Sequence, residues 1–401
     1  MSPWGELYLE GDGTMKTCCV ASESLGNIQY ENWQDIWNND NTKKIRKTIL
    51  DNKWPKNCDI CMKNEASGQF SFRHYLNSEF GHNYTDIDKT TTQEGIDTKK
   101  KITFLDIRWS NLCNYSCIMC GSPLSSKWAE LEQKYFGSTK PVIRNTTEQL
   151  IDVEKLPLDD LEKIYLAGGE PLLHPKTYEL LERCIREGKT DIRLMINSNM
   201  STLKYKKTDV IDLLSKFKHV YFIMSIDDYG ERAEYIRQGC HWPSVEKNIR
   251  RVSELSGEQS TFDIVFSPTL TLWNTLHLPD FVSWCKENLG DRVAKNSLLN
   301  VCHEPWYFNS VYLPDDMRQA SIDGLRDLYK TLEAGTFSHM LSNEIHRQET
   351  AVVTDEAWSE FLTVMKEKIQ FHQKVFKMNP EEIFPELSPL FNEIKEHHNG
   401  V

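Results

Sequence analysis

The sequence predicts an α/β protein built around a partial (β/α)6 TIM-like barrel, with a cysteine-rich N-terminal region before it and a helical C-terminal extension after it. Between residues 102 and 312, short apolar runs alternate with helical segments, as is typical of parallel βα units. Seven of the eleven cysteines lie before residue 121, whereas helical periodicity dominates from residue 313 onward. These observations separate the three regions.

Six apolar runs of strand length define the predicted barrel. They are ITFLDI (102–107), KIYLA (163–167), IRLMI (192–196), VYFIMS (220–225), FDIVFS (262–267) and SLLNV (297–301). Several are almost continuously apolar, as expected of strands buried on both faces. Predicted helices lie between them: residues 174–188 carry Pro near the start and Gly at the end, and residues 244–255 begin with Ser, which are common helix boundary signals. Six units are too few for a closed eight-stranded barrel.

The predicted domains are an N-terminal region (1–85), a polar linker (86–101), the barrel (102–312) and the helical extension (313–401). The net charge of −12 disfavours a nucleic-acid partner. No apolar run is long enough for a membrane span, and the first residues, MSPWGELYLEGDG, do not resemble a secretory signal. We therefore expect a cytoplasmic protein whose clustered cysteines bind metal rather than form disulfides.

The segment CNYSCIMC places Cys113, Cys117 and Cys120 in a C-x3-C-x2-C pattern directly after the first predicted strand. In parallel βα folds the chemistry lies at that end of the strands. Three thiolates can hold three irons of an iron–sulfur cube and leave the fourth iron open. Zinc sites usually have four protein ligands, and GSPLSSKWAEL, which follows, offers no fourth one. Packing cysteines or a zinc knuckle are the alternatives.

A second motif, YLAGGEPLLHP, follows the second predicted strand. Gly168 and Gly169 allow the backbone to approach a ligand closely, and the Glu170 carboxylate suits a cationic amine. A glycine pair alone is weak support, because many strand-to-helix turns contain glycine for steric reasons.

Together the two motifs resemble the radical S-adenosylmethionine superfamily, over residues of about 102 to 300. The resemblance implies that Cys113, Cys117 and Cys120 bind a [4Fe-4S] cluster whose open iron chelates S-adenosylmethionine. It also implies that the turn at residues 168–170 meets the amino group of the cofactor. Reduction of the cluster would then yield methionine and a 5'-deoxyadenosyl radical that abstracts hydrogen from a substrate.

Looser matches to the family imply further cofactor contacts. Met119 stands where the family usually has an aromatic residue and would pack on the adenine. Asn197, Ser225 and Asp227 end predicted strands, where relatives contact the ribose or the methionine part, and Arg237 would pair with a carboxylate. The ordinary alternative is that such residues cap helices or end strands.

The N-terminal region resembles the auxiliary-cluster extensions called SPASM and twitch domains, through Gly13-x4-Cys18 and Cys58-x2-Cys61. This resemblance implies an auxiliary [4Fe-4S] cluster on Cys18, Cys58 and Cys61. Relatives often carry a cysteine just ahead of PW, where this chain has Ser2. The fourth ligand stays open between Cys19, a non-cysteine group such as His74, and the substrate. A structural zinc site is the alternative.

The leading hypothesis is a radical S-adenosylmethionine enzyme that modifies a peptide side chain, with a flavodoxin or ferredoxin as electron donor by resemblance. The same chemistry on a small metabolite, such as a sugar or amino acid, is the alternative. A non-catalytic iron–sulfur or zinc protein is the alternative of another class. Cys240 and Cys302 are candidate hydrogen donors by their position in the sequence.

Overall fold

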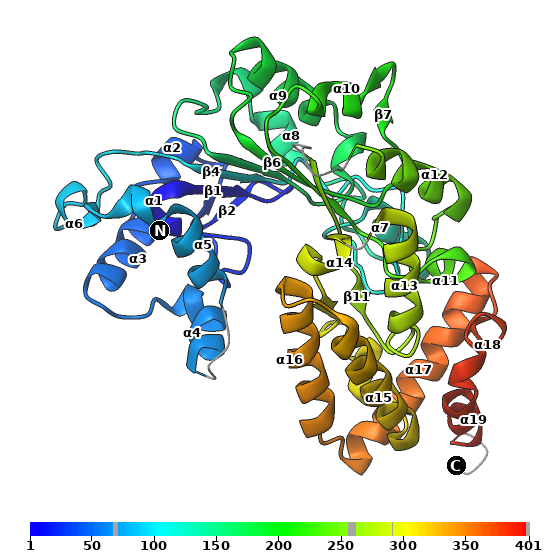
Figure 1. Ribbon diagram of the computed structural model, residues 1–401. Helices are drawn as coiled ribbons and strands as arrows, with labels where there is room; N and C mark the ends of the chain where they lie inside the picture. The colour runs from blue at the N-terminus through cyan, green and yellow to red at the C-terminus, as the bar shows by residue number, and fades with distance from the viewer. Residues whose placement is uncertain (67–70, 256–261, 291, 398–401) are drawn as a thin grey trace. The chain divides into compact units, whose positions relative to one another are not determined.

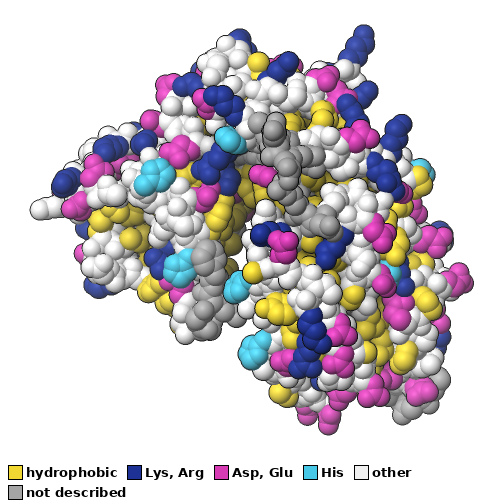
Figure 2. Space-filling view, viewed as in Figure 1, with side chains coloured by type: hydrophobic (Ala, Val, Ile, Leu, Met, Phe, Trp, Pro, Cys, Tyr) yellow, Lys and Arg dark blue, Asp and Glu magenta, His cyan; other side chains and the backbone are white. Residues whose placement is uncertain are grey.

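The computed structural model describes residues 1–66, 71–255, 262–290 and 292–397 (Figure 1). The chain divides into two compact units. Unit 1 comprises Met1–Cys113, Ser122–Asn197 and Lys204–Tyr221, and unit 2 comprises Asn114–Gly121, Ser198–Leu203 and Phe222–Val401. Both acidic and basic side chains are interspersed on the face drawn in Figure 2, so the negative net charge is not gathered into one patch there.

A mostly parallel sheet organises unit 1. Its strands lie in the order β6-β5-β4-β1-β2-β3. Their bounds are β1 (Glu6–Leu9), β2 (Thr14–Lys16), β3 (Gly26–Asn27), β4 (Phe104–Ile107), β5 (Lys163–Leu166) and β6 (Arg193–Ser198). Strands β1, β4, β5 and β6 are parallel, and β2 and β3 add antiparallel strands beside β1. A short hairpin, β7 (Lys204–Tyr205) and β8 (Thr208–Asp209), completes the strands of this unit.

The register gives the two faces of this sheet different chemistry. Leu7, Leu105, Ile164 and Leu194 pair in one row and are almost fully buried. The next row pairs Tyr8, Asp106, Tyr165 and Met195. Because side chains alternate between the faces of a sheet, the leucine row serves the core, and the polar row lies on the opposite face.

Helices surround the strands of unit 1. They are α1 (Ser2–Gly5), α2 (Trp33–Ile36), α3 (Asp40–Leu50), α4 (Asp59–Ala66), α5 (Phe72–Phe80), α6 (Ile87–Thr90), α7 (Ser126–Phe136), α8 (Thr146–Leu150), α9 (Pro175–Arg186) and α10 (Val210–Leu214). Helix α5 packs on the sheet through Phe80, whose ring stacks on Phe104 at 5.4 Å between centroids.

Unit 2 continues the alternation of strands and helices. Its strands are β9 (Val220–Met224, whose first residues fall in unit 1), β10 (Phe262–Phe266), β11 (Thr269–Leu270) and β12 (Asn300–Val301). Strand β10 lies beside β9, and β11 pairs in parallel with β12. The helices between them are α11 (Gly230–Ile236), α12 (Trp242–Ser253), α13 (Leu278–Leu289) and α14 (Arg292–Asn296). The C-terminal helices are α15 (Asp315–Thr331), α16 (Thr336–Thr350), α17 (Asp355–Phe376), α18 (Pro380–Ile383) and α19 (Ser388–Glu396).

The predicted fold class is confirmed. All six predicted barrel strands are present, as β4, β5, β6, β9, β10 and β12, and the extension after residue 313 is helical. The helix predicted to begin at Ser244 instead begins at Trp242, with His241 as its N-cap. The Ser244 hydroxyl forms a hydrogen bond with the imidazole of His241 (2.9 Å). Ser244 therefore lies in the first turn of the helix and bonds to the N-cap residue.

Two features of the N-terminal half were not predicted. Strand β1 joins the sheet as a parallel neighbour of β4. Residues 86–101 are not uniformly exposed, because Asp97 is 2% exposed and its carboxylate accepts a hydrogen bond from the Trp37 indole (2.9 Å). The predicted domain bounds stay a prediction. Within the described ranges, no helix combines the length and the apolar character that crossing a bilayer requires.

The C-terminal helices share a buried aromatic core with the end of α11. Trp273 contacts Tyr235 and Phe384, with ring centroids 5.2 and 5.3 Å from its own. His372 of α17 lies in the same core, 2% exposed, and bonds to the Tyr235 hydroxyl (3.1 Å). Burial, together with the nearby charge of Lys368, lowers the pKa of His372 to about 3.

We predict that His372 makes the fold acid-sensitive. The folded-state pKa lies below the unfolded value of about 6.5, so the unfolded chain binds a proton that the folded chain excludes. The free energy of unfolding should therefore fall by about 2 kcal/mol between pH 7 and pH 5. In urea titrations, His372→Gln should remove most of this loss, whereas the exposed-site control His241→Gln should keep it. An equal loss in all three proteins would contradict the assignment.

Candidate active site

The cysteine loop begins in unit 1, where α7 fixes the backbone around Cys113. The Ser126 hydroxyl accepts a hydrogen bond from the Cys113 amide (3.2 Å) and donates one to the Cys113 carbonyl (3.1 Å). The Ser126 amide donates to the Asn111 carbonyl (2.7 Å). Because one serine at the helix start binds both backbone groups of Cys113, this cysteine is held in a defined position.

Cys117 and Cys120 belong to unit 2 and are both partly buried. The Cys120 amide donates to the Cys117 carbonyl (2.9 Å), which closes a tight turn. The amides of Ser116 and Ile118 donate to the carbonyls of Gln238 and Ile236, so the loop is fastened to the end of α11. Burial raises the pKa of the Cys120 thiol, and the charge of Arg237 opposes that rise. The guanidinium therefore favours thiolates here, as metal ligation requires.

Arg237 and Asp227, both predicted cofactor contacts, form an ion pair with each other at 2.7 Å. The Asp227 side chain is fully buried and also accepts a hydrogen bond from the Thr269 amide (2.8 Å). In the structure Arg237 pairs with a carboxylate of its own chain, that of Asp227. Any contact of these two residues with the cofactor stays a prediction.

The glycine turn after β5 packs against the residue that precedes Cys113. The Glu170 amide donates to the Leu112 carbonyl (2.8 Å). Gly168 and Gly169 have φ values of +78° and +52°, and a Cβ on Gly169 would lie 2.3 Å from the Leu112 oxygen. Only glycine meets both demands. The glycine turn therefore packs beside the start of the cysteine loop within unit 1.

The Glu170 carboxylate is 99% buried, and one oxygen accepts a hydrogen bond from the Leu172 amide (3.1 Å). It thereby caps the 3-10 helix Pro171–Leu173. The capping interaction restricts the carboxylate to one orientation, which is useful for holding an amino group. The capping role of Glu170 is thus observed, and its role toward the cofactor stays a prediction.

The remaining predicted cofactor residues have different surroundings. The Asn197 side chain bonds to the Tyr165 hydroxyl in unit 1. In unit 2, the Ser225 amide donates to the Ser198 carbonyl (2.8 Å), and Met119 packs, partly buried, against the aromatic core around Tyr235. Their roles toward the cofactor stay predictions.

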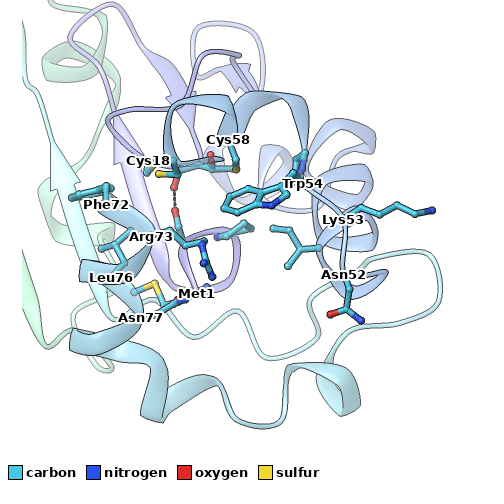
Figure 3. A pocket seen from close by; sticks show the side chains of 16 residues that line it. Met1, Cys18, Asn52, Lys53, Trp54, Cys58, Phe72, Arg73, Leu76 and Asn77 are labelled. Carbon is cyan, nitrogen blue, oxygen red and sulfur yellow. Dashed lines mark hydrogen bonds between the residues drawn. The ribbon is translucent and has the colours of Figure 1, made fainter. Parts of the chain in front are cut away.

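A cavity of about 370 Å³ in unit 1 brings three of the four N-terminal cysteines together. Cys18 follows β2, Cys58 ends a 3-10 helix and Cys61 lies on α4, and all three line the cavity (Figure 3). In Figure 3 the Trp54 ring lies among the lining side chains, near Cys58, while Lys53 extends away from them. Burial raises the pKa of Cys58 to about 11 and raises that of Cys18 well above its ordinary value.

Cys19 does not line this cavity. The charges that act on its thiol are those of Asp106, Glu6 and Arg108, which belong to the polar face of the sheet. His74 does not line the cavity either, and its imidazole lies 3.5 Å from Glu65. The Ser2 hydroxyl does line it, within hydrogen-bonding distance of Glu6 and of the Thr17 carbonyl.

The donor set of the cavity consists of three thiols. A zinc ion draws its thiolates to about 2.3 Å from a common centre, whereas a cube spreads them over separate irons. Three thiols around a cavity of this size therefore fit an iron–sulfur cluster.

Sequence reasoning missed an ion pair on the polar face of the sheet. Arg108, directly after β4, pairs with the fully buried Asp106. Its guanidinium lies 5.4 Å from the ring centroid of Tyr8 and 4.8 Å from that of Tyr165. Charged residues inside and just after a buried strand, in ITFLDIR, were the available signal.

We predict that Gly169→Ala abolishes S-adenosylmethionine binding. The added Cβ would overlap the Leu112 carbonyl and separate the turn from the cysteine loop. Gly188→Ala is the matched control, because Gly188 also has positive φ (+68°) but no atom within 4 Å of the added Cβ. Backbone strain should cost each variant about 1 kcal/mol of stability, and overlap should add about 1–3 kcal/mol to Gly169→Ala alone. Equilibrium dialysis measures S-adenosylmethionine binding, and thermal melts measure stability. Equal binding and equal stability of the two variants would contradict the prediction.

We predict that Cys19→Ser retains the auxiliary cluster, whereas Cys58→Ser loses it. Each variant is made in a background that lacks Cys113, Cys117 and Cys120, so that the remaining iron reports the N-terminal site alone. After anaerobic reconstitution, about four irons per chain should remain in the Cys19 variant. Loss of iron from both variants alike would make Cys19 a ligand and contradict the separation seen at the cavity.

Two family models match the chain. The radical SAM superfamily model matches residues 107–282, and SPASM, an iron-sulfur cluster-binding domain, matches residues 1–62. The radical SAM cyclopropyl synthase TigE of Paramaledivibacter caminithermalis is 29% identical over 188 residues. This match covers 44% of the chain and 37% of TigE.

Among solved structures, native anSMEcpe with bound AdoMet is similar at a TM-score of 0.38 and 17% identity, over 57% of this chain and 60% of that one. TYW1 with a lysine-pyruvate adduct is similar at a TM-score of 0.29 and 15% identity, over 61% and 77%. The two matching family models contain the two cysteine sets described above. Residues 107–282 therefore belong to the radical S-adenosylmethionine superfamily and residues 1–62 form a SPASM region, and the cofactors of these two parts are a [4Fe-4S] cluster, S-adenosylmethionine and auxiliary iron–sulfur. The chain spans less than half the length of TigE.

Proposed function

We propose that this enzyme removes a hydrogen atom from a peptide side chain with a 5'-deoxyadenosyl radical. The observation that carries the proposal is the packing of the Gly168–Gly169 turn against Leu112, beside Cys113. When bound, the cluster and S-adenosylmethionine supply the electron and the sulfonium from which that radical forms.

The protein residues bind and orient these groups. Cys113, Cys117 and Cys120 provide three thiolates, and Ser126 fixes the first of them. The Glu170 carboxylate, already oriented by the Leu172 amide, receives the amino group of the cofactor.

The N-terminal cavity provides the second redox site of the proposal. Cys18, Cys58 and Cys61 would hold an auxiliary cluster through their thiolates, and Ser2 lines the same cavity. Such a cluster would supply either an electron acceptor after substrate deprotonation or a site for the substrate. A flavodoxin or ferredoxin is the proposed electron donor, and the cytoplasm is the proposed compartment.

A peptide is the proposed substrate because the helical extension, α15 to α19, adds a large element after the barrel that could cover a long groove. Incubation with a deuterated tryptic peptide mixture should transfer deuterium to 5'-deoxyadenosine. If deuterium were transferred only from a deuterated pool of sugars and amino acids, the substrate would be a small metabolite and not a peptide.

We predict that the reconstituted enzyme, reduced with dithionite, forms 5'-deoxyadenosine from S-adenosylmethionine. The variant with Cys113, Cys117 and Cys120 all changed to Ala should form none and should lose about four irons. Cys184→Ala is the control, because this buried cysteine of α9 lies outside both cysteine sets; it should keep both iron and activity. No product from wild-type protein with a full iron content would overturn the proposed function.

A further inference from the structure

The polar face of the unit 1 sheet holds a buried arginine that the proposed function does not use. Arg108 extends from the end of β4 between two tyrosines, one on each neighbouring strand. The register pairs Asp106 with Tyr8 of β1 and with Tyr165 of β5. The rings therefore flank the guanidinium from both sides, at 5.4 and 4.8 Å.

Arg108 also adjoins the glycine turn that the cofactor needs. A Cβ on Gly168 would lie 2.4 Å from the Arg108 Cδ atom. The absence of a side chain at Gly168 is therefore what allows Arg108 to lie against the turn. A group bound by Arg108 would thus lie beside the cofactor-binding turn, where a substrate belongs.

One edge of the guanidinium is in use and the rest is available. Asp106 accepts one N–H from each of the two terminal nitrogens. An arginine has five N–H donors, and within the described ranges the other three have no protein acceptor. The Asp106 side chain is fully buried, whereas that of Arg108 keeps 12% exposure. The Arg108 side chain is therefore partly accessible, unlike that of Asp106.

Such an arginine is preorganised for an anion. A guanidinium binds a carboxylate through two parallel N–H donors in its own plane. The two rings and Asp106 already hold the guanidinium in place, so little side-chain freedom is left to lose on binding. Rings on both sides favour an in-plane approach, which suits a flat carboxylate.

We propose that Arg108 binds a carboxylate of the substrate and so selects acidic substrates. The inference deepens the proposed function and rests on it for the identity of the bound molecule as the substrate. In a peptide, the carboxylate comes from an acidic side chain or from the C-terminus. Both sources share the same chemistry at Arg108.

Three tripeptide probes separate these sources in calorimetric titrations of the anaerobic holoenzyme. They are acetylated Gly-Glu-Gly amide, acetylated Gly-Gln-Gly amide, and acetylated Gly-Gln-Gly with a free C-terminus. Wild type should bind at least one acidic probe about tenfold more tightly than the neutral amide, as a charge-assisted pair allows. The preferred probe identifies the source. No preference for either acidic probe would overturn the proposal.

The variants test whether Arg108 acts on the ligand or only on the fold. Asp106→Asn with Arg108→Gln removes both charges together, so no buried charge is left unpaired; this double variant should fold and lose the preference. Arg108→Lys alone keeps a positive charge beside Asp106, so no buried charge is left unpaired, but it lacks the forked donors of arginine; it should fold and weaken the preference. A preference that is unchanged in the double variant would overturn the proposal.

Arg193→Gln is the matched control. Arg193 also pairs with a carboxylate, Glu79 at 2.9 Å, and lies 5.7 Å from the Phe80 ring centroid. This variant should keep the preference for an acidic probe. Loss of that preference would contradict the assignment of the carboxylate site to Arg108.

S-adenosylmethionine carries a carboxylate of its own, so its affinity is measured in parallel. An unchanged value in the double variant supports a substrate site. A tenfold loss of cofactor affinity with probe binding intact would assign Arg108 to the cofactor and overturn the proposal. Wild-type protein that prefers an acidic probe but forms no 5'-deoxyadenosine would fail the proposed function and leave the carboxylate site standing.

Discussion

The contact between the glycine turn and the Leu112 carbonyl is the constraint on which the site depends. Two loops that follow neighbouring parallel strands meet there with no side chain between them. Positive φ at both glycines turns the chain so that the Glu170 amide reaches the carbonyl. Cys113, at the start of the cysteine loop, and the Glu170 carboxylate are therefore positioned relative to each other by backbone geometry within unit 1. This is a firmer coupling than flexible side chains would give.

Strand β1 extends the same principle to the N-terminal region. Because it pairs in parallel with β4, Tyr8 enters the same row as Asp106. The chain then turns through β2 and delivers two adjacent cysteines to different surroundings. Cys18 lines the cavity, while Cys19 lies within the electrostatic reach of Asp106 and Arg108. One sheet thus carries both the auxiliary cavity and the polar face.

The sequence alone was sufficient to predict the features of the fold and the site that depend on local patterns of residues. Continuous apolar runs revealed the six barrel strands, and the spacing of Cys113, Cys117 and Cys120 revealed the cluster motif. Strand β1 was not predicted, because ELYL is only four residues long and begins with an acidic residue, which is buried in the structure. The division between Cys18 and Cys19, and the stacking of Arg108 between two tyrosines, depend on register and on contacts between distant segments. No single-sequence periodicity contains that information.

Asp106 explains how a barrel of apolar strands tolerates the charge of Arg108. A buried guanidinium without a carboxylate would be strongly destabilising, so the fully buried Asp106 offsets its charge from the same strand. Burial raises the pKa of Asp106 to about 6, and the charge of Arg108 holds it below the value that burial alone would give. The carboxylate consumes one edge of the guanidinium and, with the tyrosine rings, holds it in place. The ion pair with Asp106, which offsets the charge of Arg108 inside the fold, therefore also orients the remaining donors of Arg108.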